Sequence, residues 1–206
     1  MSQNGQTQYF GTTKMMLPKL FTLFCLIALA NNVQEATGKK LTAKYWTDKF
    51  NMGVNPAGGW YAEIYRSPEK IGHLPERYGI NATRAFSTHA YYLLEGKDFY
   101  PFHQLKSTHL WHFYHGARIT LFVIDHVTGE LTRHHIGKSA KNFVVEVKHG
   151  DYYAARLTYP GEGKYSLLGL TTTPGFEIED YYQPTTEELI TKYPRHKKFI
   201  KSLTRE

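Results

Sequence analysis

The sequence predicts a mostly β fold, a sandwich or barrel of short strands in one domain. The chain has 206 residues, which suits a single domain with appendages. It contains 16 tyrosines, and aromatic residues make up 15% of the chain, as is typical of β-rich proteins. From residue 85 onward, short runs of strand-forming residues alternate with turns at a spacing of about ten residues. Together these observations favour an all-β sandwich or barrel.

Residues 1–30 are expected to be a signal peptide. An apolar run over residues 20–30 follows Lys14 and Lys19 and ends in small residues suited to signal-peptidase cleavage. A membrane span needs about 20 apolar residues, so a cleaved signal is favoured over an anchor. We therefore expect a secreted mature chain without a stable membrane span. The only cysteine, Cys25, lies in this run, so the mature chain would have no disulfide or thiolate site.

The charge balance argues against a nucleic-acid partner. The whole chain has a formal charge of +7, and residues 31–206, with 23 basic and 18 acidic residues, carry +5. The densest basic run, residues 194–201, is short. Nucleic-acid binding calls for a longer basic stripe with interleaved stacking aromatics. We expect no nucleic-acid partner, and a solvated helix face in this segment.

The first elements connect the signal to the domain. Residues 31–52 are predicted to be a linker that contains a short helix over 42–52, with Tyr45, Trp46 and Phe50 on one side. The domain itself is predicted to span residues 53–206.

A first strand and a long loop follow. Residues 53–59 are rich in glycine and proline and lead into a strand over 60–66. Residues 67–84 carry prolines, glycines and charges and are predicted to be a loop. This loop contains the sequon Asn81-Ala82-Thr83, so Asn81 is a candidate N-glycosylation site in a secreted chain.

Seven further strands are predicted from alternating apolar residues bounded by turns, as in Ile119, Leu121 and Val123. They cover residues 85–94, 111–114, 118–125, 130–136, 143–147, 152–157 and 164–172. Two short helices are predicted to end the chain. Thr185 or Thr186 caps the first, and the second covers residues 196–203.

Residues 102–116 hold the densest group of chemically active side chains, four histidines and four aromatic rings. Imidazole can act as an acid, a base or a neutral metal ligand near neutral pH, and its clustering beside aromatic rings is typical of a lined pocket. The alternative is that these side chains fill a sheet core and its edge.

The order of residues in this segment resembles the first motif of cupin barrels, in which a glycine, a His-x-His pair, a glutamate and a closing glycine follow one another. The corresponding residues here are Gly96, His103, Leu105 at the second histidine, His109 at the glutamate, and Gly116. The second cupin motif aligns with Lys148-His149-Gly150 and places Tyr153 at a metal-ligand position.

The closer resemblance is to the cupin type 5 family, which is catalogued as a domain of unknown function. The matching segments are Gly58-Gly59-Trp60-Tyr61 with Glu63, Tyr65-Arg66-Ser67, Phe102-His103, Trp111-His112-Phe113-Tyr114, residues 150–157 and Pro174-Gly175-Phe176. This resemblance implies a double-stranded β-helix, or jelly roll, that is usually dimeric and binds a small molecule in the mouth of its barrel. A homodimer is accordingly expected, although the fold by itself does not select a function.

A divalent metal is the first chemical alternative. A metal site needs three or more converging ligands, and the cupin positions supply only His103 and His109. His112 lies three residues from His109, and residues three apart in a regular strand point to opposite faces. We therefore expect no cofactor, with a metal on His103 and His109 as the alternative.

A metal-independent sugar epimerase or isomerase is the second alternative. Proton abstraction next to a carbonyl needs a base with a pKa near neutral, and delivery to the other face needs an acid. His103 or His112 would be the base and Tyr153 or Tyr92 the acid. Arg66 or Lys106 would hold an anionic group. Because tyrosines are so numerous, any pocket in this chain would contain one.

The favoured hypothesis is a binding protein for a small, carbohydrate-like ligand. Aromatic side chains would stack on flat apolar faces of the ligand, and histidine, arginine and glutamate would fix its hydroxyls. The predicted ligand-binding residues are Trp60, Glu63, Arg66, Tyr92, His103, His109, Trp111 and Phe113.

Overall fold

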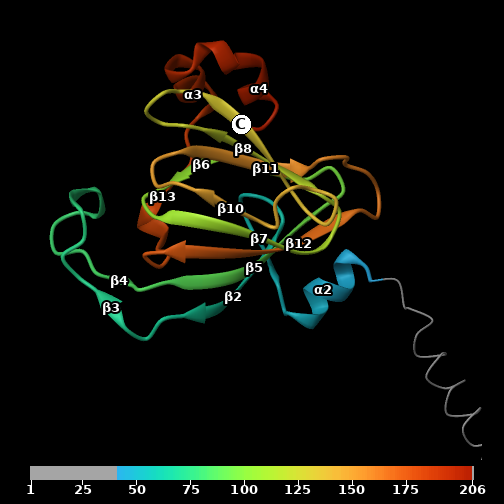
Figure 1. Cartoon of the computed structure of the whole chain (residues 1–206), viewed down its shortest axis with the longest axis horizontal. Coiled ribbons are helices and arrows are strands. Elements are labelled where there is room, and N and C mark those ends of the chain that lie inside the picture. Colours follow the sequence, from blue (N-terminus) through green and yellow to red (C-terminus); the bar gives the residue numbers. More distant parts are fainter. Residues whose placement is uncertain (1–40, 206) are drawn as a thin grey trace, which may run out of the picture. The chain divides into compact units, whose positions relative to one another are not determined.

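The computed structural model describes residues 41–205, which belong to one compact unit. The predicted signal peptide and residues 31–40 of the predicted linker lie outside the described residues. Figure 1 shows two β-sheets with short helices on their outer sides. In the part of the chain that the structure describes, no helix is both long and apolar enough to cross a membrane.

Two antiparallel sheets face each other. The larger has the strand order β1 (Gly53–Val54), β2 (Trp60–Arg66), β5 (Thr88–Glu95), β12 (Tyr165–Thr173), β7 (Thr108–Gly116) and β10 (Val144–Val147). The smaller has the order β13 (Tyr181–Tyr182), β6 (Phe99–Leu105), β11 (Tyr152–Leu157), β8 (Ile119–Ile124) and β9 (Leu131–Ile136). The predicted jelly roll is confirmed.

The predicted loop over residues 67–84 has a little structure of its own. The short strands β3 (Lys70–Ile71) and β4 (Arg84–Ala85) pair with each other, and the 3-10 helix η1 (Glu76–Tyr78) lies between them. This segment extends to the left of the sheets in Figure 1.

Alternation along the strands builds the core between the sheets. On β7, His109 and Trp111 are buried, whereas Leu110 and His112 are half-buried on the other face. Trp111 joins Tyr92 and other residues of both sheets in the main hydrophobic cluster. Burying a large apolar side chain contributes roughly 1.5–3 kcal/mol, so these inward residues hold the two sheets together.

The C-terminal helices cover the outer face of the five-stranded sheet (Figure 1). They are α3 (Thr186–Lys192), η3 (Pro194–His196) and α4 (Lys197–Lys201). Thr185 is the N-cap of α3, because its hydroxyl accepts from the Glu188 amide and the Glu188 carboxylate accepts from the Thr185 amide. Leu189 and Ile200 are buried against Phe122 of β8. The predicted cap and both predicted helices are therefore present.

The N-terminal helix α2 (Ala43–Lys49) covers part of the outer face of the six-stranded sheet. Trp46 and Phe50 pack with Leu93 and Leu167 of that face. The indole nitrogen of Trp46 also donates to the hydroxyl of Tyr165 at 3.0 Å. The predicted short helix within residues 42–52 is confirmed, and it packs directly on the barrel.

Strand β6 was not predicted as a strand. Pro101 lies in the middle of it and has no N–H, which argues against a central strand. The structure accommodates the proline with a register shift, opposite Tyr153 and Ala155 of β11. The neighbouring Phe102 amide donates instead to the carbonyl of Leu203 in the C-terminal segment. A hydrogen bond to a residue distant in the sequence thus replaces a hydrogen bond within the sheet.

Candidate functional site

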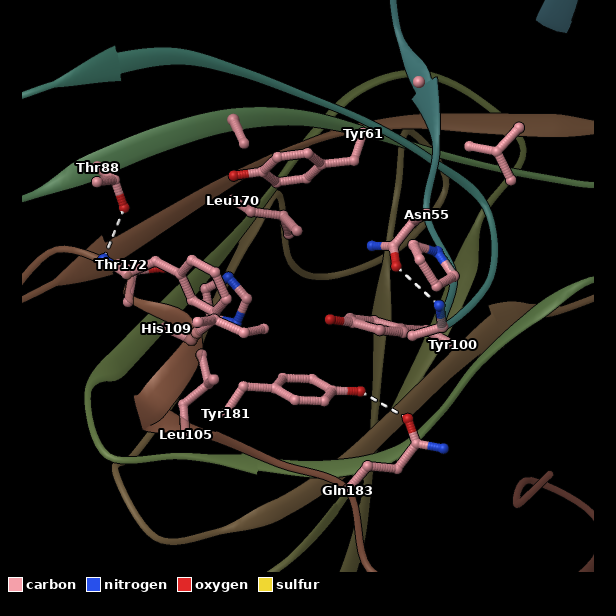
Figure 2. Close-up of a pocket in the computed structure, with 17 residues that line it drawn as sticks. Asn55, Tyr61, Thr88, Tyr100, Leu105, His109, Leu170, Thr172, Tyr181 and Gln183 are labelled. Atoms are coloured by element: carbon pink, nitrogen blue, oxygen red, sulfur yellow. Dashed lines mark hydrogen bonds between the residues drawn. The ribbon is translucent and has the colours of Figure 1, made fainter. Parts of the chain in front are cut away.

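An open cavity of about 470 Å³ lies between the two sheets. Tyr61 of β2, Tyr100 of β6 and Tyr181 of β13 line it, and the segments 53–57 and 176–183 complete its wall (Figure 2). Ligand pockets have volumes of roughly 300–1,000 Å³. The cavity is therefore large enough for a small organic molecule.

The described side chains that line the cavity include hydrogen-bonding groups but no charged group. The polar lining groups, besides the tyrosines, are Asn55, Thr88, His109, Thr172 and Gln183. Among the described lining residues there is no Asp, Glu, Lys or Arg. Burial raises the pKa of Tyr61 and of Tyr181 to about 12, so both phenols stay neutral. The remaining lining is largely aliphatic and aromatic.

The loop that carries one wall of the cavity is fixed by a set of hydrogen bonds. The hydroxyl of Tyr92 donates to the carbonyl of Gly58 at 2.7 Å, and the Gly59 amide donates to the Asp98 carboxylate at 2.7 Å. Arg205, near the C-terminus, donates to the same carboxylate at 2.5 Å. Gly59 has a φ of 72°, and a Cβ there would lie 2.6 Å from a backbone carbonyl, so glycine is required. Tyr92 is fully buried and supports the wall from behind.

Of the predicted site residues, only His109 belongs to the cavity lining. Its Nδ1 atom lies 2.7 Å from the hydroxyl of Tyr153 on β11. Burial, together with repulsion by His103 and His112, lowers the pKa of His109 to about 3. Burial raises the pKa of Tyr153 well above its usual value. Both groups are therefore neutral near pH 7.

His103 lies inside the barrel but is sealed from the cavity. It is fully buried, with its ring centroid 4.0 Å from those of both Tyr100 and Tyr153. Its Nδ1 lies 2.8 Å from the carbonyl of Pro101, which can only accept, so Nδ1 carries the proton. Its Nε2 has no hydrogen-bond partner among residues 41–205. Burial lowers the pKa of His103 to about 3, which keeps this imidazole neutral.

The donor set does not fit the metal implied by the cupin resemblance. Among the described residues, no group of three His, Cys, Asp or Glu side chains converges on one point. Leu105 stands at the second histidine position, and Tyr153 is engaged with His109. His103 and His109, the pair named for the alternative of a bound metal, remain two ligands, one fewer than a protein site for a divalent metal requires.

His112 does not share the cavity with the other predicted histidines. It lies on the outer face of β7, where its Nε2 is 3.0 Å from the hydroxyl of Thr171. The same hydroxyl is 2.7 Å from Nδ1 of His89. The separation of His109 and His112 follows from strand alternation, as expected. The three residues predicted as a catalytic set, His103, His112 and Tyr153, are thus not gathered around one open space.

The remaining predicted ligand residues lie around the cavity without lining it. Trp60 packs on the outer face of β2, and its indole nitrogen donates to Glu95 at 3.0 Å. Arg66 pairs with Glu63 at 2.9 Å and with Glu177 at 2.7 Å, and it also donates to the carbonyl of Phe176.

The two aromatic residues predicted on β7 belong to the core. Trp111 is fully buried, and Phe113 packs against the main hydrophobic cluster.

Sequence reasoning missed the tyrosines that line the cavity. Tyr61 is next to the predicted Trp60 and points to the opposite face of β2, so the right strand was identified with the wrong side. Tyr100 lies on the strand that was not predicted. Tyr181 follows the acidic segment after β12, where no periodic pattern marks a wall. Strand alternation, applied from Trp60, is the one signal that would have found Tyr61.

Comparisons with known proteins agree with this architecture. The hypothetical protein from Leishmania major has a TM-score of 0.73 and 24% sequence identity, with 81% of this chain and 100% of that chain covered. A protein from Shewanella oneidensis has a TM-score of 0.69 and 25% identity, with 80% of this chain and 98% of that chain covered. A search of curated proteins finds no match.

The family model that matches the chain is described as cupin superfamily (DUF985) and covers residues 44–183. These residues include both sheets, from β1 to β13, and every residue of the predicted catalytic set. The chain belongs to the DUF985 family of the cupin superfamily.

Proposed function

We propose that the protein binds a small, carbohydrate-like molecule in the barrel cavity. The observation that supports this function is the uncharged cavity of about 470 Å³ with tyrosine rings in its wall. Rings such as Tyr61 and Tyr181 stack on the apolar face of a sugar, and their hydroxyls bond to its polar groups. The side-chain amides of Asn55 and Gln183 supply further donors and acceptors at the wall.

Thermal denaturation with a panel of neutral mono- and disaccharides tests the proposal. A ligand present at 100 times its Kd adds about 2.7 kcal/mol to the free energy of unfolding. For a domain of this size, that corresponds to a rise in Tm of about 5–10 °C. Failure of every neutral sugar to raise the Tm of the folded protein would contradict the proposed ligand.

A pair of variants makes the test specific to the cavity. Ala57 lines the cavity from the loop after β1, so Ala57→Phe fills space that the ligand needs. We expect it to abolish the rise in Tm. Val127, which is 79% exposed in the turn between β8 and β9, provides the control. Val127→Ala should leave the response to the ligand unchanged.

An epimerase or isomerase is the weaker candidate. That chemistry needs a base and an acid on opposite sides of one substrate. His109 is the predicted histidine beside the cavity, and burial lowers its pKa to about 3, which makes it a weak base near pH 7. Binding without proton transfer therefore accounts better for the cavity.

We also propose that the chain is secreted, forms a homodimer and carries an N-glycan at Asn81. Asn81 is exposed in the loop between η1 and β4, with a φ of 59°, so an attached glycan would project into solvent. Sequencing of the mature N-terminus tests the signal peptide, with Asn31 as the expected first residue. Light scattering tests the homodimer, and a mass twice that of the mature chain is expected.

A further inference from the structure

The hydrogen bond between Tyr153 and His109 determines which imidazole nitrogen carries the proton. Tyr153 is 1% exposed, and the only partner of its hydroxyl among the described residues is Nδ1 of His109, at 2.7 Å. A buried phenol with a raised pKa keeps its proton. Donation to Nδ1 satisfies both atoms, whereas the reverse arrangement leaves the phenol proton buried without an acceptor. Nδ1 therefore accepts, and the proton of the neutral imidazole lies on Nε2.

This N–H group is accessible from the cavity. His109 belongs to the cavity lining (Figure 2), and no described residue bonds to its Nε2. The fully buried atoms without a partner include Nε2 of His103 but not that of His109. Thr172, opposite His109 in the register of β12 and β7, adds a hydroxyl to the same wall. A bound molecule thus meets a fixed N–H donor at this wall.

Among the lining residues that the structure describes, no charged side chain is available to pair with a charged ligand. The described lining residues include no acidic or basic side chain. Arg66 bonds to the carbonyl of the lining residue Phe176, but its guanidinium is occupied by Glu63 at 2.9 Å and Glu177 at 2.7 Å. A carboxylate or ammonium group that entered the cavity would lose its hydration without gaining an ion pair.

We propose that the cavity selects uncharged ligands that direct a carbonyl or ether oxygen to Nε2 of His109. Tyr153 is the positioning residue, because it holds the imidazole in the form that donates toward the cavity. The inference rests on the proposed binding function and narrows its ligand class. The ring oxygen or keto group of a neutral sugar meets the requirement, and a sugar acid or amino sugar does not.

The tautomer is measured without any ligand. Imidazole ¹⁵N shifts of the full chain near pH 7, assigned with His109→Gln, should show His109 protonated on Nε2. In Tyr153→Phe that preference should be lost. Tyr181→Phe also removes a hydroxyl from this region, but that hydroxyl donates to Gln183, so the His109 shifts should not change. A proton on Nδ1, or a charged imidazole, in the unmodified protein would overturn the inference.

Three small probes separate this inference from the proposed function. Cyclohexanone and tetrahydropyran carry the required acceptor, and cyclohexanecarboxylate carries a charge instead. We expect the first two to shift the His109 Nε2 resonance and to bind about tenfold or more tightly than the carboxylate. In Tyr153→Phe their affinity should fall by about three- to tenfold. Equal binding of the carboxylate overturns the selection alone, whereas no binding by any probe contradicts the binding function as well.

Discussion

Acidification should destabilise the protein because two histidines are buried in the barrel as neutral groups. Burial lowers the pKa of both His103 and His109 to about 3 in the folded chain. In the unfolded chain a histidine has a pKa of about 6.5. Between these values the unfolded state binds protons that the folded state does not, so stability is lost as the pH falls below about 6.5. At about pH 4.5 each histidine then costs about 3 kcal/mol of the free energy of unfolding.

Urea denaturation of the full chain and of His109→Gln, at about pH 7 and about pH 4.5, measures this loss. Gln can still accept from Tyr153 and has no proton to gain. Carboxylates and the other histidines contribute equally to both proteins. The loss of stability between the two pH values should therefore be smaller by about 3 kcal/mol in the variant. His89→Gln is the matched control, because His89 is half-buried on the outer face and should give a smaller change.

An equal loss of the free energy of unfolding between the two pH values in the unmodified protein and in His109→Gln would refute the reasoning. It would mean that His109 takes up a proton as readily in the folded chain as in the unfolded one. The imidazole would then be hydrated, and the wall of the cavity that it lines would not be the dry, uncharged surface inferred from its burial.

Three further changes test other parts of the site. Arg84→Met removes both close hydrogen bonds to the buried Asp180, at 2.7 and 2.8 Å, so urea denaturation should show a loss of about 3–5 kcal/mol; a loss below 1 kcal/mol would mean that the carboxylate is solvated. Tyr92→Phe leaves the Gly58 carbonyl unpaired, and urea denaturation should show a cost of about 1–3 kcal/mol, with weaker sugar binding in the thermal assay; unchanged affinity would separate the loop from the binding site. Asn81→Gln should lower the mass of the secreted protein by one glycan in mass spectrometry without changing its Tm, and an unchanged mass would contradict glycosylation.

The fold was predictable because its strands carry local patterns. Strand β11 was predicted with the bounds that the structure has, and the predicted strand over residues 60–66 coincides with β2. Strand β6 was missed because Pro101 gives a local signal against a strand. The Phe102 amide finds its hydrogen-bond acceptor in the carbonyl of Leu203, which is distant in the sequence. A bond of that kind depends on the packing of the C-terminal helices, which no local pattern contains.

The site was less predictable than the fold, because a cavity is defined by several strands at once. His109 was identified from its place in the motif that resembles cupins, and strand alternation correctly separated it from His112. The aromatic walls were assigned to residues that include Trp60 and Trp111, but large apolar side chains also serve in packing. Trp111 is buried in the main hydrophobic cluster, and Trp60 packs against a second cluster on the outer face of the sheet. Composition shows that rings are plentiful. It does not show which ones border empty space.

The Tyr153 and His109 pair links the departure from the cupin motif to the character of the cavity. The resemblance places both residues at metal-ligand positions, yet here they bond to each other at 2.7 Å. His103, at a third such position, directs its Nδ1 proton to the Pro101 carbonyl. Each of these contacts satisfies a buried polar atom within the protein. A carboxylate in place of His109 would bring a negative charge that needs an ion or a cation beside it, whereas a neutral imidazole needs only the phenol. Where the cupin motif has an anionic ligand, this chain therefore has an imidazole whose N–H faces an uncharged cavity, and a neutral ligand can use this donor.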